Sequence, residues 1–200
     1  IINNKIRLFV TILILIISLQ PWSKANGIKE FEIDGMTVGD SLLDFYSIEE
    51  IKLEIKEAVY YPKSKKMMVV GFQSKKSNLY AKYDFHIKNN DKKYIIYSVK
   101  GLVKLPIDKC LEQKKEVISE IENQINNTNR NDYKGDYGYD YGNSIAHVSD
   151  FDFENGDSIR VWCMEWDSNN ENVKANLYWD GLAVNISLKE QVDFIQYEAY

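Results

Sequence analysis

The sequence contains few of the residues that mark extreme protein classes. Its 200 residues include 3 Pro and 10 Gly, too few for a collagen-like or low-complexity chain. Hydrophobic residues make up 44% of the chain and aromatic residues 13%, enough to form a core that a disordered protein lacks. Acidic residues outnumber basic residues by 30 to 25, which argues against nucleic-acid binding through a basic surface. This length is typical of one domain.

Long hydrophobic runs are also missing, apart from one near the start of the sequence. Lys5 and Arg7 precede the apolar run 8–19, and Ala25 ends a Ser-Lys-Ala triplet with small residues where signal peptidase reads them. The run is shorter than the roughly 20 apolar residues that span a bilayer. We therefore expect residues 1–25 to be a signal peptide cut after Ala25, and residues 26–200 to be one exported, soluble domain without a membrane span. An uncleaved membrane anchor is the alternative.

Cysteine is almost absent, since Cys110 and Cys163 are the only two. An even number in an oxidising compartment favours a disulfide, and two buried free thiols are the alternative. This disulfide would close a loop of about 54 residues and stabilise the fold by roughly 4 kcal/mol in the chain-entropy model.

Patterns typical of metal sites are incomplete. Neither cysteine has a Cys or His neighbour at the spacing of zinc ligands. Asp150, Asp152 and Glu154 alternate as calcium ligands do, but Asn155 and Val161 stand where an EF-hand needs Gly and Glu. We expect no metal site, no cofactor and no catalytic centre.

Capping residues and hydrophobic periodicity predict an α+β fold. Ser47 and Glu50 form a capping box for a helix that reaches about residue 58. Ser187 and Glu190 form another for a C-terminal helix, and a third helix is expected from Asp108 to about residue 127. The expected strands are 67–72, 80–88, 94–105, 145–153, 158–166, 177–179 and 182–187. They predict an antiparallel β-meander sheet packed against helices, with the polar stretch 126–143 as a flexible loop.

Alternation along the strands predicts which side chains share a face. Ile159 and Val161 share the face of Cys163, so Trp162 and Met164 point the other way. If Cys163 faces the helix that begins near Cys110, the disulfide joins sheet to helix.

Two segments 66 residues apart resemble each other. Residues 84–91 and 150–157 both read as a strand that enters a tight turn. Convergence of two hairpins on similar turn chemistry explains the echo, and two duplicated α+β units are the alternative.

One short motif suggests an enzyme. Gly39, Asp40, Ser41 and Leu42 spell the block that carries the nucleophilic serine of GDSL-type esterases. Such a serine needs a histidine base, but the family's C-terminal Asp-x-x-His pair is absent. Helix capping by Ser41 explains the same residues without catalysis.

Aromatic residues form the remaining candidate site. Tyr137, Tyr139 and Tyr141 lie among acidic residues and glycines, a composition typical of adaptable binding loops. A set of three tryptophans could form an exposed platform for a glycan or peptide, or a second core layer under a helix. They are Trp162, Trp166 and Trp179.

Five parts of the sequence carry a resemblance to a known family, and they are 35–44, 84–101, Cys110, 152–163 and 189–200. Together they resemble a family of exported proteins of marine SAR11-type alphaproteobacteria. The resemblance covers nearly all of residues 26–200 and implies a periplasmic location, but no established activity. The Gly35-Met36-Thr37 turn also resembles, more weakly, BamE-like and β-lactamase-inhibitor-like α+β modules, which bind proteins.

The sequence therefore favours a periplasmic, non-enzymatic module that binds an envelope protein or a small ligand. A small serine hydrolase that uses Ser41 is the first alternative. A glycan binder that uses the tryptophan face is the second.

Overall fold

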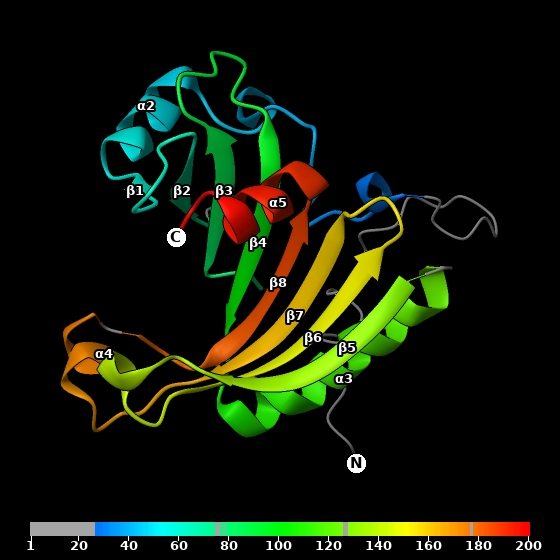
Figure 1. The fold of residues 1–200 in the computed structure, drawn as a ribbon, viewed down its shortest axis with the longest axis vertical. Coiled ribbons are helices and arrows are strands. Elements are labelled where there is room, and N and C mark those ends of the chain that lie inside the picture. The colour runs from blue at the N-terminus through cyan, green and yellow to red at the C-terminus, as the bar shows by residue number, and fades with distance from the viewer. Residues whose placement is uncertain (1–26, 75–76, 78, 126–127, 177) are drawn as a thin grey trace.

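A computed structural model describes residues 27–74, 77, 79–125, 128–176 and 178–200, so the expected signal peptide lies outside the described residues. The fold is α+β, with one eight-stranded antiparallel sheet and helices on both of its faces (Figure 1). The strands are β1 (Val59–Tyr60), β2 (Met67–Gln73), β3 (Lys82–Lys88), β4 (Ile96–Lys104), β5 (Thr128–Asp136), β6 (Ile145–Phe153), β7 (Ser158–Glu165) and β8 (Gly181–Ser187). The α-helices are α2 (Ile48–Lys56), α3 (Ile107–Gln124), α4 (Glu171–Ala175) and α5 (Lys189–Tyr197).

The strand order is β1-β2-β3-β4-β8-β7-β6-β5, so each half of the chain forms a helix followed by four antiparallel strands. β4 and β8, the last strands of the two halves, pair at the centre. If the two halves were duplicates, the third strand of the first half, β3, would correspond to the third strand of the second half, β7. The similar segments 84–91 and 150–157 lie instead at the ends of β3 and β6. The two segments therefore occupy non-equivalent hairpins. Duplication remains a prediction, and the echo does not support it.

One face of the sheet carries a continuous apolar core. Phe85, Val99, Ile186, Ile159 and Phe151 lie directly opposite one another on five successive strands. Each is at most 2% exposed. Successive residues of a strand point to opposite faces of the sheet. The residues directly before and after each member of this row therefore point to the other face.

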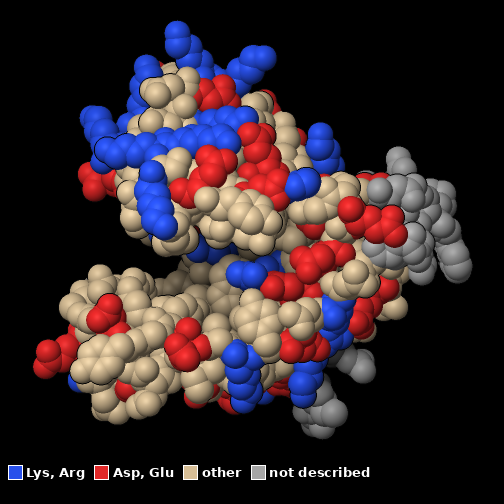
Figure 2. All heavy atoms as spheres, viewed as in Figure 1, with Lys and Arg blue, Asp and Glu red and all other residues tan. Residues whose placement is uncertain are grey.

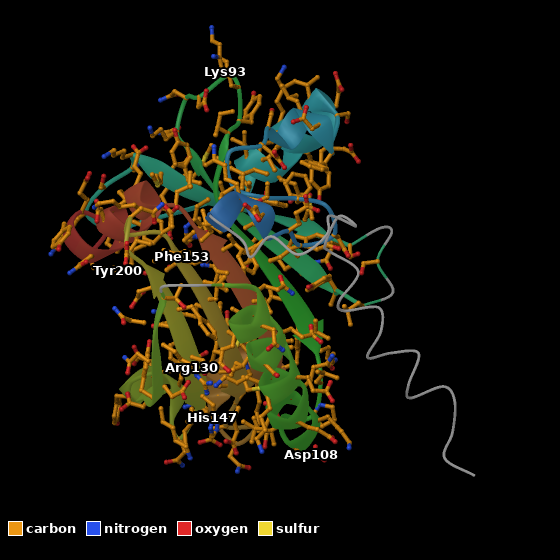
Figure 3. All side chains as sticks on the ribbon, turned by 90° about the vertical axis from the view of Figure 1, so that its right-hand side faces the viewer. Lys93, Asp108, Arg130, His147, Phe153 and Tyr200 are labelled. Atoms are coloured by element: carbon orange, nitrogen blue, oxygen red, sulfur yellow. A yellow bond between two sulfur atoms is a disulfide. The ribbon has the colours of Figure 1, made fainter. Side chains whose placement is uncertain are left out.

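The long helix α3 covers this core over the second half of the sheet (Figure 3). Cys110 in its first turn and Cys163 on β7 lie at disulfide distance, with 2.06 Å between the sulfur atoms and 5.8 Å between the Cα atoms. Ile159 and Val161 share the buried face of Cys163. The predicted pairing and the predicted face are both confirmed. The N-cap of α3 is Pro106 rather than Asp108, which lies in the first turn.

Over the first half of the sheet, the core is covered by α2 and by the segment before it. The predicted capping box of Ser47 and Glu50 is present at the start of α2. Ile51 on α2 is fully buried, and the ring of Tyr46 stacks on Phe72 of β2 with 3.9 Å between centroids. These contacts fix one side of the sheet and leave the opposite side to the functional site.

The helix α5 lies on that opposite side, over one end of it (Figure 1). Its predicted capping box is wrong, because Ser187 is the last residue of β8 and accepts a hydrogen bond from Asn185 within the sheet. The N-cap is Leu188, and the helix buries Gln191 and Phe194. A strand residue already engaged in side-chain bonding within its sheet is unavailable as a cap.

The expectation of a loop over residues 126–143 is wrong for half of that range. Residues Thr128–Asp136 form β5, which pairs along its whole length with β6 at one edge of the sheet. Arg130 holds the strand by ion pairs to Glu122 of α3 and to Asp132. An edge strand that is largely exposed shows no apolar alternation, so its sequence reads as a loop.

The strand expected at 177–179 is also wrong for its described residues, 178 and 179. β8 pairs with β4 and β7, and Trp179 lies outside any strand. The helix α4, which precedes it, was not predicted. Asn170 caps α4 by accepting hydrogen bonds from the backbone amides of Asn172 and Val173, and Val173 is the one residue it buries. Such a short helix has too little periodicity to be recognised. No helix in the described part of the chain is both long and apolar enough to cross a membrane.

Candidate functional site

The face of the sheet opposite the core carries a row of polar side chains across its centre. Asp150, Arg160, Asn185, Lys100 and Asp84 lie directly opposite one another on β6, β7, β8, β4 and β3. Their neighbours along each strand belong to the core, so these five side chains point away from it. We call this set the polar row.

The polar row forms part of a deep groove. A cavity of about 650 Å³ lies over Lys100 and Arg160 and extends past Trp162 toward Trp179. A second cavity of about 410 Å³ continues beneath α5 and shares Lys100, Arg160 and Trp162 with the first. Figure 2 shows the cleft between the two halves of the molecule, with Lys and Arg atoms at its base. The size of the larger cavity is typical of ligand pockets.

The charges on the groove floor are unequally paired. Asp84 accepts ion pairs from Lys82 at 2.9 Å and from Lys100 at 2.7 Å. Burial alone would raise the pKa of Asp84, but the two ammonium groups outweigh it and lower that pKa. Gly71 lies opposite Asp84 on β2, and a Cβ there would come within 2.7 Å of the Lys82 side chain. The side chain of Lys82 therefore occupies space that any side chain at position 71 would take.

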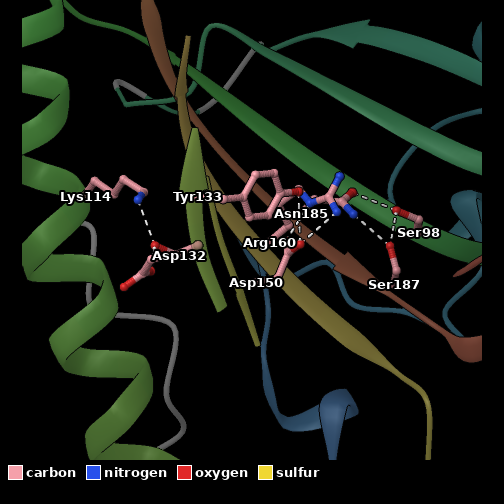
Figure 4. A network of polar contacts seen from close by, with 9 residues as sticks. Ser98, Lys114, Asp132, Tyr133, Asp150, Arg160, Asn185 and Ser187 are labelled. Atoms are coloured by element: carbon pink, nitrogen blue, oxygen red, sulfur yellow. Dashed lines mark hydrogen bonds and ion pairs between the residues drawn. The ribbon is translucent and has the colours of Figure 1, made fainter. Parts of the chain in front are cut away.

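The other half of the polar row is held by a bidentate pair. Nε and Nη2 of Arg160 donate to the two carboxylate oxygens of Asp150 at 2.6 and 2.9 Å. Tyr133 on β5 donates its hydroxyl to the same carboxylate (Figure 4). This fork geometry fixes the guanidinium plane and leaves Nη1 outside the pair.

Between the two charged groups lies a network of neutral polar side chains. Ser98 donates to Oδ1 of Asn185 at 2.7 Å, and Nδ2 of Asn185 donates to Ser187 at 2.7 Å. Ser187 donates in turn to Ser98 at 3.0 Å (Figure 4). The floor between Lys100 and Arg160 is therefore ordered before any ligand arrives.

Aromatic side chains form the wall of the groove. Trp166 is stacked between Tyr137 and Tyr178, with ring centroids 4.4 Å away on each side. Tyr141 packs edge-on against Trp166 at 5.9 Å. Both faces of the Trp166 ring are thus covered by this protein's own tyrosines.

The remaining predicted aromatic residues divide between two places. Trp162 and Trp179 line the same cavity as Tyr137 and Trp166, and all four are partly buried. Tyr139 is 99% exposed and does not line this groove. The structure therefore brings together the three predicted tryptophans and Tyr137. Tyr141 does not line the cavity but packs edge-on against Trp166 and Tyr137.

No described hydrogen bond joins either histidine to a serine or threonine side chain. Nε2 of Gln191 donates to Nδ1 of His86 at 2.6 Å, so the proton of the neutral ring lies on Nε2, 3.2 Å from the hydroxyl of Tyr61. Burial lowers the pKa of His86 to about 4, so the ring is neutral at pH 7. His147 contacts the carboxylate of Glu165 at 3.1 Å.

The serine of the GDSL-like motif acts as a helix cap. The hydroxyl of Ser41 donates to the carbonyl of Lys93 at 2.6 Å and accepts from the backbone amide of Leu43. Asp44 completes a capping box for the short 3₁₀ helix Leu42–Asp44. No described hydrogen bond joins Ser41 to either histidine.

A second serine has a lysine neighbour but is inaccessible. Lys114 of α3 donates to Ser149 at 2.7 Å, and Ser149 donates to Asp132 on the core side of the sheet. Ser149 is 0% exposed, so no substrate reaches its hydroxyl.

Among the described residues, no group of three or more His, Cys, Asp or Glu side chains could hold a metal ion.

The sequence did not reveal the charged half of the site. Lys82, Asp84, Lys100 and Arg160 lie on one face of three strands, β3, β4 and β7, and strand alternation alone would have assigned them to an outward face. Their convergence depends on the strand order, which alternation does not encode. No protein family, curated protein or solved structure matches this chain. The function is therefore inferred from the geometry of the site.

Proposed function

We propose that the chain is an exported, periplasmic, non-enzymatic binding module and that the groove on the open face of its sheet is the binding site. The observation that carries this proposal is the groove itself. It joins a half-buried aromatic wall to a floor of ordered charged side chains in a cavity of about 650 Å³.

The floor favours binding because it is organised in advance. Asp84 and Asp150 hold the cationic side chains in fixed positions, and the network of Asn185 with its two serines holds the strand surface between them. A ligand that meets such a floor loses little free energy in ordering it. The resemblance of the Gly35-Met36-Thr37 turn to protein-binding modules favours the same class of function.

The two alternatives gain less support. The capping bonds of Ser41 account for its position without catalysis. A glycan platform made of three tryptophans needs open ring faces, and both faces of Trp166 are occupied by tyrosines. Trp162 and Trp179 remain available to a ligand within the groove.

Photo-crosslinking tests the proposal with a matched pair of positions. Tyr133 lines the groove and is 40% exposed, whereas Tyr139 is 99% exposed and lies outside it. Each is replaced by p-benzoylphenylalanine, the mature protein is incubated with envelope extract of the source organism, and adducts are identified by mass spectrometry. We expect one stoichiometric adduct at position 133 and none at 139. Equal labelling at both positions, or none at 133, would overturn the proposal.

A further inference from the structure

We infer that the groove takes a small amphipathic organic anion, with its acidic head over the polar row between Lys100 and Arg160 and its apolar body against Trp162. This inference rests on the proposed function and adds the chemical class of the ligand. It depends on three features: the charge of the floor, the position of its cationic groups and the spacing of the apolar wall.

The charge of the floor is incompletely balanced. Lys82 and Lys100 share the single carboxylate of Asp84, which leaves one net positive charge in this group of three. Arg160 and Asp150 form a neutral pair beside it. Asp136 also lines the larger cavity, and its carboxylate accepts a hydrogen bond from the backbone amide of Gly138. The whole chain has a formal net charge of −5, so the positive excess of the group of three is a local exception. A cationic site at the base of a cleft attracts an anion, because low-dielectric walls concentrate its field.

The cationic side chains retain capacity for a ligand. An ammonium group has three donors, and one on Lys100 is used by Asp84. The side chain of Lys100 is 29% exposed and that of Arg160 is 49% exposed, whereas that of Asp84 is 10% exposed. An incoming group therefore meets the cations before it meets the carboxylate.

Position brings Lys100 and Arg160 to the same ligand group. Each lies directly opposite Asn185, one on either side. Neighbouring strands lie about 4.8 Å apart, so the two backbones are roughly 10 Å apart and both long side chains reach the space between. Both also line the two cavities, so they mark the point where the cavities join. An acidic head over Asn185 would contact both.

The apolar wall begins one side-chain row further along the strands. Trp162, Ala183 and Leu102 lie directly opposite one another, two residues along from Arg160, Asn185 and Lys100. Two residues of a strand span about 7 Å, and four span about 13 Å. The wall continues at that second distance with Met164 and with the ring of Trp179. A ligand that satisfies both regions has its acidic group at one end and an apolar body about 7 to 13 Å long.

Two fluorescent probes separate the acidic head from the apolar body. 1-Anilinonaphthalene-8-sulfonate has a sulfonate on an aromatic body, and N-phenyl-1-naphthylamine has the same body without the charge. We expect the mature protein to bind the sulfonate about tenfold more tightly, the size of effect typical of one hydrogen bond to a charged group. Decanoate should displace the sulfonate and decan-1-ol should not, which extends the preference to a carboxylate.

Variants assign this preference to the polar row. Lys100→Gln should weaken sulfonate binding about tenfold and leave the neutral probe unchanged, and Lys100→Arg should restore it. Lys115→Gln removes the same charge from an exposed position on α3 and should change neither affinity. Circular dichroism and urea unfolding establish that each variant is folded.

The outcomes distinguish this inference from the proposed function. Equal affinity for the two probes, or a Lys100→Gln variant that keeps the sulfonate preference, overturns the anion inference. The proposed function would stand in that case if the adduct at position 133 still forms. If no adduct forms at position 133, the proposed function itself is overturned. If the Lys100→Gln variant also keeps its preference for the sulfonate probe, that probe binds at another surface.

Discussion

The six-membered ring of Trp179 lies directly over Gly181, the first residue of the central strand β8. A methyl group at position 181 would lie 2.6 Å from Cζ3 of Trp179 and 2.3 Å from the carbonyl oxygen of Val103. Gly181 pairs with Lys104 on β4 and with Met164 on β7. The aromatic wall of the groove and the central strand pair therefore depend on one residue without a side chain.

We expect Gly181→Ala to destabilise the protein by about 1–3 kcal/mol, the range typical of overpacking. The contact with the backbone oxygen of Val103 is too short for a side-chain rotation to relieve it. Urea unfolding measures the loss, and the shift of tryptophan emission reports movement of Trp179. Gly135→Ala is the matched control, because a Cβ there meets only Tyr133 at 3.9 Å. Equal stability of the two variants would contradict the close approach.

Removal of the disulfide should cost about 4 kcal/mol in the chain-entropy model, because Cys110 and Cys163 are 53 residues apart in the sequence. The double variant Cys110→Ser/Cys163→Ser removes the cross-link without leaving a free thiol. Urea unfolding of the variant, compared with the oxidised and the reduced wild type, gives the change in free energy. A variant as stable as the oxidised wild type would show that this link constrains the unfolded chain little.

Ser41→Ala should lower the free energy of unfolding by about 1 kcal/mol, as expected for the loss of an N-cap. Ser168→Ala, at an exposed position outside any helix or strand, is the control and should change stability by less than about 0.5 kcal/mol. Hydrolysis of p-nitrophenyl acetate provides a second readout. Ester hydrolysis that the wild type catalyses and Ser41→Ala abolishes would contradict the assignment of Ser41 as a cap only.

The free energy of unfolding should decrease as the pH is lowered, because burial makes His86 harder to protonate in the folded protein. Its pKa is about 4 in the folded protein, against an ordinary value of 6.5, so the unfolded chain binds the proton more readily. The stability that the protein loses through His86 is therefore absent above pH 6.5. This loss grows as the pH falls and is complete below about pH 4. The full penalty is on the order of 3 kcal/mol.

The variant His86→Gln isolates this contribution. Urea unfolding at pH 7.0, 5.5 and 4.5 should show a shallower decline for the variant than for the wild type. The free energy of unfolding lost between pH 7.0 and pH 4.5 should be larger for the wild type than for the variant, whatever their difference in stability at pH 7.0. Parallel declines would mean that His86 is protonated as easily in the fold as in the unfolded chain.

Much of the fold follows from local patterns in the sequence. The capping box of Ser47 and Glu50, the strands around Phe85 and Phe151, and the face of Cys163 all depend on neighbours within a few residues. Patterns failed where the tertiary environment decides. β5 is polar on both sides because it lies at an edge, and Ser187 bonds within the sheet instead of capping α5.

The sequence by itself determined the α+β class, one pair of cysteines able to bond, and the alternation that separates an apolar face from a polar one. Only the tertiary structure decided that Asp84, Lys100, Asn185, Arg160 and Asp150 form one row. The physical reason is that side-chain alternation is set by each strand alone, whereas neighbours across strands are set by pairing order and register. Lys100 and Asn185 are 85 positions apart in the sequence, and they lie side by side only because β4 and β8 pair at the centre of the sheet.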